Sequence, residues 1–320
     1  MKHYLGIDLG GTNLVVGVVD EERRIVASES IKTHAPRPAE SICDDIAAIA
    51  DRLLAKLQLA REDIAWAGLG SPGVIHNGVV VFASNLGFDD VPLGGLLQER
   101  LGIPVLLEND ANAAAYGEFL GGAGRGYESL TMLTIGTGIG GGIIADSRIW
   151  SGFNGAAGEL GHIVIDMGGR RCPCGKDGCL EAYCSAASLR KLTQEAMEQD
   201  EGSLMWELCG DRIDTASAKT PFRAAEQGDE AAKGVVERFL YALSLGVSNA
   251  INLLQPQVFV LGGGVSREGE TILAPLRELV KKQTYLKTDE QRPKIVQAEL
   301  GSEAGLIGAA LLGLQDAQSR

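Results

Sequence analysis

The first thirty residues alternate short apolar runs with glycine turns, which is typical of antiparallel strands in a meander. From residue 39 the pattern changes, because Ile42, Ile46, Ile49 and Leu53 recur at helical spacing. Beyond this helix, apolar runs of strand length alternate with longer periodic stretches, which predicts an α/β protein. The predicted strands are 4–7, 13–19, 24–31, 64–69, 104–107, 130–135, 142–145, 258–261 and 294–298, and the predicted helices are 39–57, 93–101, 111–120, 230–254, 271–281 and about 304–315.

One pattern occurs twice, as an apolar strand that runs into a glycine-rich turn. The first copy is GIDLGGT at residues 6–12, and the second is TIGTGIGGG at residues 134–142. Two similar halves of this kind would face each other across a cleft, and 320 residues are enough for two domains. We expect an N-terminal α/β domain over 1–120, joined by the C-terminal helix at about 304–320, and a larger α/β domain over 121–303.

Composition and charge exclude several classes of protein. Hydrophobic residues make up 45% and charged residues 22%, which is the balance of a globular chain and not of a disordered one. The 43 glycines are clustered without a collagen period, as expected where the backbone closely approaches a ligand. A net charge of −13 offers no attraction to nucleic acid or an anionic membrane, so we expect neither as a partner.

The sequence also indicates where the protein is located and whether its cysteines form disulfides. It contains no apolar stretch long enough to span a bilayer, and its start does not have the pattern of a secretory signal. We therefore expect a cytoplasmic protein. Six cysteines in such a compartment favour metal binding or reduced thiols over disulfides.

The first glycine turn has the residue types of a phosphate-binding loop. Gly10 and Gly11 would let backbone N–H groups approach a phosphate, and the hydroxyl of Thr12 is a further donor. An acid in such a loop repels phosphate unless a divalent cation lies between them, so Asp8 indicates Mg²⁺. The alternative is an ordinary hairpin with a type I′ turn. The turn lacks the lysine of a Walker loop.

Two further glycine clusters favour nucleotide binding. The segment 134–142 holds five glycines and two threonines, and a merely flexible turn would carry a high entropic cost on folding. Gly262, Gly263 and Gly264 follow an apolar strand and precede a predicted helix, a place where a nucleoside or phosphate can lie at a helix N-terminus.

A cysteine motif predicts a structural zinc site. Cys172, Cys174 and Cys179 have the spacing C-x-C-x4-C, and His162 precedes them by ten residues. Three thiolates and one imidazole complete a tetrahedral zinc shell and leave no position for water. Three free buried thiols are the alternative, and Cys184 is an alternative ligand. The remaining cysteines, Cys43 and Cys209, are expected in packed surroundings.

Carboxylates and amides complete the candidate chemistry. Asp110 ends an apolar strand and precedes an alanine-rich helix, so it suits either a general base or a plain N-cap. Glu159 and Glu181 flank the zinc motif, although each could also be a solvated loop charge. Together with Asn85 and Asn109, these two acids would suit the vicinal hydroxyls of a polyol.

These motifs resemble those of the ROK sugar kinases, and within them the bacterial ATP-dependent glucokinases. The resemblance runs from Gly6 to the C-terminal helix. The segments that carry it are 6–12, Glu108-Asn109-Asp110-Ala111-Asn112, 136–142, Gly158-Glu159-Leu160-Gly161-His162, the cysteine motif through Glu181, and the segment 85–88.

The resemblance implies an actin-like, ribonuclease-H-like ATPase fold with two α/β domains around a central cleft. It implies that Asp110 is the general base on the 6-hydroxyl of the sugar, and that His162 uses one ring nitrogen for zinc and the other for the sugar. The implied sugar contacts are Asn85, Asn109, Asp110, Glu159, His162 and Glu181. The implied ATP contacts are Asp8, which orients Mg²⁺, and Gly10, Gly11, Thr12, Asn13, Thr137, Gly138 and 262–264, with Asn13 at a position where relatives often have lysine or threonine.

Three other functions compete with a glucokinase. A kinase for mannose, fructose, allose or N-acetylmannosamine would use the same machinery with another sugar loop. A sugar-responsive regulator would need a DNA-binding module, for which the sequence before the first strand leaves no room. A binding-only relative would not need Asp8 and Asp110. The donor, ATP or polyphosphate, stays open, and family resemblance alone suggests a homodimer or homotetramer.

Overall fold

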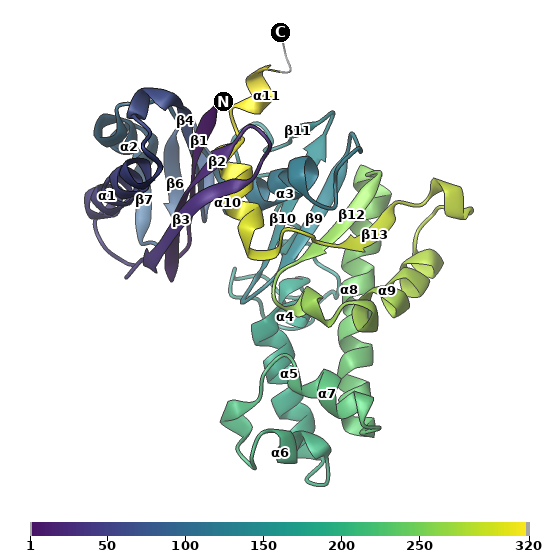
Figure 1. Ribbon diagram of the computed structural model, residues 1–320. Helices are drawn as coiled ribbons and strands as arrows, with labels where there is room; N and C mark the ends of the chain where they lie inside the picture. The colour runs from purple at the N-terminus through teal and green to yellow at the C-terminus, as the bar shows by residue number, and fades with distance from the viewer. Residues whose placement is uncertain (1, 318–320) are drawn as a thin grey trace. The chain divides into compact units, whose positions relative to one another are not determined.

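The computed structural model describes residues 2–317 and has a mixed α/β architecture (Figure 1). Proximity of Cα atoms divides the chain into two compact units. Unit 1 comprises Met1–Leu130, Gly142–Gly158 and Glu299–Arg320, and unit 2 comprises Thr131–Gly141 and Glu159–Ala298. The domain limits expected at residues 120 and 303 stay a prediction.

A five-stranded sheet forms the centre of unit 1, with the strand order β3-β2-β1-β4-β8. The meander predicted from the first thirty residues is confirmed, since β1, β2 and β3 pair antiparallel. The strands β4 and β8 then add in parallel to β1. The bounds are β1 (His3–Leu9), β2 (Asn13–Asp20), β3 (Ile25–Lys32), β4 (Ile64–Ser71) and β8 (Val105–Asn109). Because β1, β4 and β8 run in parallel, their carboxyl ends bring Asp8 and Asn109 to the same edge of the sheet.

The helices of unit 1 mostly match the predictions. Helices α1 (Ala39–Leu57) and α2 (Leu93–Leu101) have the predicted limits, and α3 (Asp110–Gly121) begins one residue early. The helix predicted at about 304–315 is wrong as one element, because it divides into α10 (Ala304–Ala310) and α11 (Leu314–Ala317). The break coincides with Gly313, where a Cβ would lie 2.5 Å from the indole of Trp66.

Helix α10 packs directly on β1 and β4, from the other end of the chain (Figure 1). Glycines on both strands permit this approach. A Cβ at Gly6 would lie 2.4 Å from the carbonyl oxygen of Leu306, and one at Gly68 would lie 1.8 Å from that of Ala309. The glycine that opens the first motif therefore serves the packing of α10 rather than a ligand.

Sequence analysis missed a small antiparallel sheet of unit 1, with the order β5-β6-β7. Its strands are β5 (Val74–His76), β6 (Val79–Ala83) and β7 (Phe88–Val91), and they are too short for a clear alternation of apolar and polar residues. The turn between β5 and β6 is Asn77-Gly78, and both residues have positive φ. Asn-Gly is a strong hairpin signal, so the sequence did contain the evidence.

The second five-stranded sheet has the order β11-β10-β9-β12-β13. Its strands are β9 (Leu130–Ile135), β10 (Ile139–Ala145), β11 (Arg148–Ile149), β12 (Val258–Gly262) and β13 (Lys294–Gln297). Leu130 and residues 142–149 belong to unit 1. Strand β10 begins three residues before the predicted limit. The helices of unit 2 are α4 (Glu181–Cys184), α5 (Ala186–Gln199), α6 (Leu204–Leu208), α7 (Thr220–Glu226), α8 (Glu230–Leu254) and α9 (Glu270–Gln283).

Helix α8 has the predicted limits and supplies much of the core of unit 2. Its apolar face includes Phe239, Leu243 and Val247, all fully buried. The ring of Phe239 meets that of Phe222 edge-on, with centroids 5.9 Å apart. Across residues 2–317, no helix combines the length and the apolar character needed to cross a membrane.

Candidate functional site

The first glycine turn joins β1 to β2 and is held from the end of β3. The amide of Gly10 donates to the carbonyl of Asn13 at 2.9 Å. Thr33, which is fully buried, donates its hydroxyl to the carbonyl of Gly10 at 2.6 Å and its amide to that of Thr12 at 2.9 Å. Neither Gly10 nor Gly11 has positive φ, so the type I′ alternative is wrong. The turn leaves Thr12 and Asn13 exposed.

Asp8 and Asp110 interact electrostatically at the edge of the first sheet. Burial, and secondly the negative charge of Asp110, raise the pKa of Asp8 to about 6. The second residue of α10, Gly305, lies against the same carboxylate, since a Cβ there would be 2.9 Å from Oδ2 of Asp8. Carboxylate oxygens in a partly buried site are ligands that Mg²⁺ prefers.

The N-cap of α3 is Asn109, so the alternative that Asp110 is a plain N-cap is wrong. The Asn109 side-chain oxygen accepts from the amides of Ala111 and Asn112, at 2.9 and 3.1 Å. Its Nδ2 donates to the carbonyl of Gly73 at 3.1 Å. Asp110 is the first helical residue, and its carboxylate also accepts from the Ala111 amide at 2.9 Å. Asn109 therefore performs the capping, and Asp110 is the first residue of the helix that it caps.

A partly buried polar network around Glu108, a residue with no predicted role, holds Asn109 in place beside Asp110. Glu108 Oε1 accepts from the amide of Asn109 at 2.9 Å and from Nδ2 of Asn112 at 3.0 Å. Glu108 Oε2 accepts from the hydroxyl of Ser151 at 2.9 Å. The network fixes the start of α3, and Glu108 stood inside the motif that carries the family resemblance.

Asn85 lies in the loop between β6 and β7, exposed and next to the first glycine turn. A Cβ at Gly11 would lie 3.3 Å from the carbonyl oxygen of Asn85. Unit 1 thus places the loop that carries Asn85 beside the turn that carries Thr12.

The second glycine turn, between β9 and β10, is fixed by hydrogen bonds at both ends. Within the turn, the amide of Gly136 donates to the carbonyl of Gly138 at 2.9 Å. The amide of Ala186 donates to the carbonyl of Gly136 at 2.8 Å, and the amide of Ile139 donates to Oε2 of Glu181 at 2.7 Å. Thr137 is exposed at the tip.

Two other sequence motifs pack against the ends of this turn. A Cβ at Gly161 would lie 2.3 Å from the carbonyl oxygen of Ile139, and one at Gly263 would lie 2.4 Å from that of Ile135. The segments 159–162, 179–181 and 262–264 therefore meet at the turn 136–139. Unit 2 brings its separate motifs into one constellation, whose exposed surface includes Thr137.

A pocket of about 370 Å³ opens beside this turn within unit 2. Gly136, Thr137 and Gly264, which belong to the second and third glycine clusters, line it. Several other lining residues were not predicted. They lie in a loop and at a helix start that fold back onto the turn, and no local sequence pattern marks such residues as part of a pocket. These residues are Ala186, Ser217, Ala218, Lys219 and Glu268.

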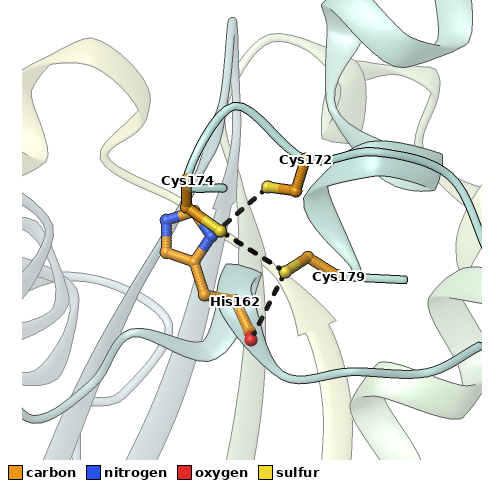
Figure 2. A group of neighbouring side chains, drawn as sticks. All are labelled: His162, Cys172, Cys174 and Cys179. Atoms are coloured by element: carbon orange, nitrogen blue, oxygen red, sulfur yellow. Dashed lines mark hydrogen bonds between the residues drawn. The ribbon is translucent and has the colours of Figure 1, made fainter. Parts of the chain in front are cut away.

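The four residues of the metal motif converge in unit 2 (Figure 2). One ligand atom from each of His162, Cys172, Cys174 and Cys179 lies within 4.8 Å of all the others. Sγ of Cys174 and Sγ of Cys179 are 3.6 Å apart, and Sγ of Cys172 is 3.7 Å from Nδ1 of His162. Zinc–sulfur bonds of about 2.3 Å give a tetrahedral edge of about 3.8 Å, so the cluster fits a zinc ion.

The local environment shifts the pKa values of the three thiols in different directions. Burial raises the pKa of Cys172 to about 12, and burial likewise raises that of Cys179. A backbone hydrogen bond from Lys176 lowers the pKa of Cys174, the exposed member. Two buried thiols that resist ionisation become thiolates only when a bound metal takes up their charge.

The two ring nitrogens of His162 face different neighbours, whereas their predicted roles toward zinc and sugar stay a prediction. Its Nδ1 faces Cys172, whereas Nε2 lies 3.9 Å from Oε2 of Glu159. Glu159 is exposed, and Glu181 is partly buried. The alternative ligand Cys184 is turned away, because its thiol donates to the carbonyl of Phe239 inside the core.

Comparisons with known proteins agree with this arrangement. The family model described as "ROK family" matches residues 4–316. A glucokinase of Halalkalibacterium halodurans is 37% identical, over 99% of this chain and 97% of that protein. A xylose repressor of Caldicellulosiruptor bescii is 27% identical, over 98% of this chain and 78% of that protein.

The fold is shared with solved structures. A ROK family glucokinase from Streptomyces griseus, solved in complex with glucose and AMPPNP, superimposes with a TM-score of 0.81 at 35% identity, over 98% of this chain and 99% of that one. The predicted actin-like, ribonuclease-H-like fold is thereby confirmed.

Proposed function

This chain belongs to the ROK family, and we propose that it is an ATP-dependent glucokinase that phosphorylates the 6-hydroxyl of glucose. The observation that carries the proposal is the placement of Asp8 and Asp110 at the carboxyl ends of parallel strands on either side of β4, where a Cβ at Gly70 would lie 3.5 Å from Cα of Asp110 and 3.9 Å from the carbonyl oxygen of Ile7. A protein that only binds a sugar has no use for two neighbouring carboxylates, whose mutual repulsion has an energetic cost. The glucokinases among its relatives support the choice of sugar.

Asp110 acts as the general base. Its carboxylate stands at the first residue of α3, fixed by the cap at Asn109. It accepts the proton of the 6-hydroxyl as that oxygen attacks the γ-phosphorus, while the bond from the γ-phosphorus to the bridging oxygen of the β-phosphate breaks and ADP leaves. Asp8 holds Mg²⁺, which neutralises charge on the phosphates when it is bound. The amide of Gly11 and the hydroxyl of Thr12 donate to the phosphate chain, and Gly10, whose amide is bonded to the carbonyl of Asn13, shapes the turn that presents them.

Unit 2 binds the nucleotide and part of the sugar. Thr137 and Gly138 contact phosphates, residues 262–264 flank the adenosine, and the pocket beside the turn holds the base and ribose. Lys219, which lines this pocket, offers a positive charge to the nucleotide. Asn85, Asn109, Glu159, His162 and Glu181 hold the sugar hydroxyls, and a structural zinc fixes the ring of His162 through Nδ1.

The test is the release of ADP from Mg-ATP with a panel of hexoses, with Asp110→Asn as the control protein. We expect turnover with glucose, and a loss of at least about 10²-fold in the control with little change in sugar affinity. A preference for mannose, fructose, allose or N-acetylmannosamine would keep the mechanism and replace the substrate. Activity only with polyphosphate would replace the donor.

A sugar-responsive regulator is the second candidate, because the xylose repressor is a relative over almost the whole chain. Such a protein would bind a sugar without releasing ADP, so the same panel combined with calorimetry separates the two functions. We favour the kinase because the glucokinase relative has the higher identity. The cytoplasmic location and the homodimer or homotetramer stay predictions.

A further inference from the structure

We propose that Glu181 is a positioning residue for the nucleotide, because its carboxylate holds the glycine turn 136–139 in its phosphate-binding conformation. The inference rests on the proposed function and extends it: the acid assigned to the sugar also sets the affinity for ATP, even when no sugar is bound. The starting observation is the hydrogen bond of 2.7 Å from the amide of Ile139 to Oε2 of Glu181.

The carboxylate of Glu181 is in close contact with the turn. A Cβ at Gly138 would be only 2.5 Å from the same Oε2 atom, so the acid occupies the space that any other side chain at this position would need. A hydrogen bond to an ionised acceptor is stronger than one between neutral groups. The Ile139 amide is therefore held at one point, at the end of the turn that carries Thr137.

Glu181 is itself fixed on the side away from the turn. Its backbone carbonyl accepts from the amide of Ser185 at 3.2 Å and from the hydroxyl of Ser188 at 2.7 Å. Its other carboxylate oxygen, Oε1, lies 3.9 Å from Sγ of Cys172. Glu181 thus connects the glycine turn to the cysteine motif, which ends two residues before it. A shift of the cysteine motif can therefore move the turn.

The turn is also a wall of the nucleotide pocket. Gly136 and Thr137 line the cavity of about 370 Å³, and Ala186, which donates to Gly136, lines it as well. Loss of the Glu181 contact frees the Ile139 end of the turn while the Gly136 end stays bonded. The donors for the phosphates then have to be ordered during binding, which weakens affinity.

The test is calorimetric titration of the whole protein with Mg²⁺ and AMPPNP in the absence of sugar. Glu181→Ala should raise the Kd about tenfold, the effect of losing one hydrogen bond to a charged group. Glu181→Gln keeps an acceptor oxygen and should stay within about twofold of wild type. The matched control is Glu198→Ala, which removes an exposed acid of α5 in the same unit. Glu198 has no part in the proposed site, so the Kd should not change.

A double-mutant cycle tests the contact itself. Gly138→Ala alone should weaken AMPPNP binding, because the new Cβ meets the Glu181 carboxylate. In the Glu181→Ala background the same change should cost much less, since the obstructing group is gone. Equal effects of Gly138→Ala in both backgrounds would contradict the proposal.

Amide exchange provides a readout that does not depend on nucleotide. In Glu181→Ala the peptide that contains Ile139 should exchange faster than in wild type, and in Glu181→Gln it should not. If Glu181→Ala fails to fold, the Gln variant and Gly138→Ala decide the question, and normal affinity in Gly138→Ala would overturn the proposal. Unchanged AMPPNP affinity in a folded Glu181→Ala protein overturns this inference alone, whereas a wild type that binds no AMPPNP overturns the proposed function.

Discussion

The carboxylate of Asp8, at the end of β1, lies against Gly305, the second residue of α10, although the two are at opposite ends of the chain. This contact depends on the close packing of α10 on β1 and β4. Gly305 thereby limits the space around Asp8, the proposed magnesium ligand, although Gly305 is neither acidic nor polar.

Gly305→Ala should impair turnover without unfolding the protein. The added Cβ would be 2.9 Å from Asp8 Oδ2, so the carboxylate has to move, and we expect kcat/KM for Mg-ATP to fall at least about tenfold. Alanine favours helix over glycine, so the melting temperature should not fall. The control is Gly234→Ala in α8, where a Cβ would meet nothing within 4 Å, and both activity and stability should be retained. Wild-type kinetics in Gly305→Ala would contradict the argument.

Asp8→Asn should make the ligand-free protein more stable at neutral pH and inactive. The folded pKa of Asp8, about 6, lies above its ordinary value of 3.8, so the folded state binds more protons between these values. Stability therefore falls as the pH rises from 3.8 to 6 and stays lower above it. Removing the charge should gain on the order of 1–3 kcal/mol at pH 7.5, and little below pH 4. Thermal unfolding across this pH range measures the difference.

The matched control for that experiment is Asp20→Asn, because the pKa of Asp20 is lowered in the folded protein whereas that of Asp8 is raised. Burial acts to raise the pKa of Asp20, but hydrogen bonds from the amide and guanidinium of Arg24 lower it overall. Asparagine at position 20 should therefore destabilise the protein at neutral pH. A gain in stability for both variants would mean that net charge, and not the local environment of Asp8, is the cause.

The cysteine motif should bind about one zinc ion per chain, as the tetrahedral shell requires. Cys174→Ser should lose the metal and lower the free energy of unfolding by at least about 2 kcal/mol, because loss of a structural metal is among the largest single effects. Elemental analysis and chemical unfolding measure both quantities. Cys209→Ala lies outside the cluster and should keep its zinc. Full zinc occupancy in Cys174→Ser would show that the ligand set is wrong.

Glu108→Ala should lower kcat more than it raises the KM for glucose. The carboxylate orders the amide of Asn109 and the side chain of Asn112, and so it positions Asp110 without touching substrate. We expect a loss of about tenfold in kcat from the misplaced base. Glu108→Gln keeps an acceptor for Asn109 and should recover most of this loss. Steady-state kinetics of both variants decide whether Glu108 positions Asp110 or only stabilises the fold. The control is Ser151→Ala, which removes the hydrogen bond from the Ser151 hydroxyl to Glu108.

Local signals predicted most of the elements of this protein. The limits of α1, α2 and α8 follow from apolar periodicity, which is a property of neighbouring residues and does not depend on the fold. The convergence of the zinc motif was predicted for a related reason. Cys172, Cys174 and Cys179 span eight residues, so a short loop suffices to bring them together.

Tertiary structure alone decided what those elements bring into contact. Glu181 reaches the amide of Ile139 from 42 residues away, and Gly305 reaches Asp8 across nearly the whole chain. Lys219 lines the pocket from a loop without any motif. Sequence patterns report the local environment of each residue, whereas such contacts depend on how sheets and helices pack. The residues proposed to carry the chemistry could therefore be predicted from the sequence, but the residues that position them could not.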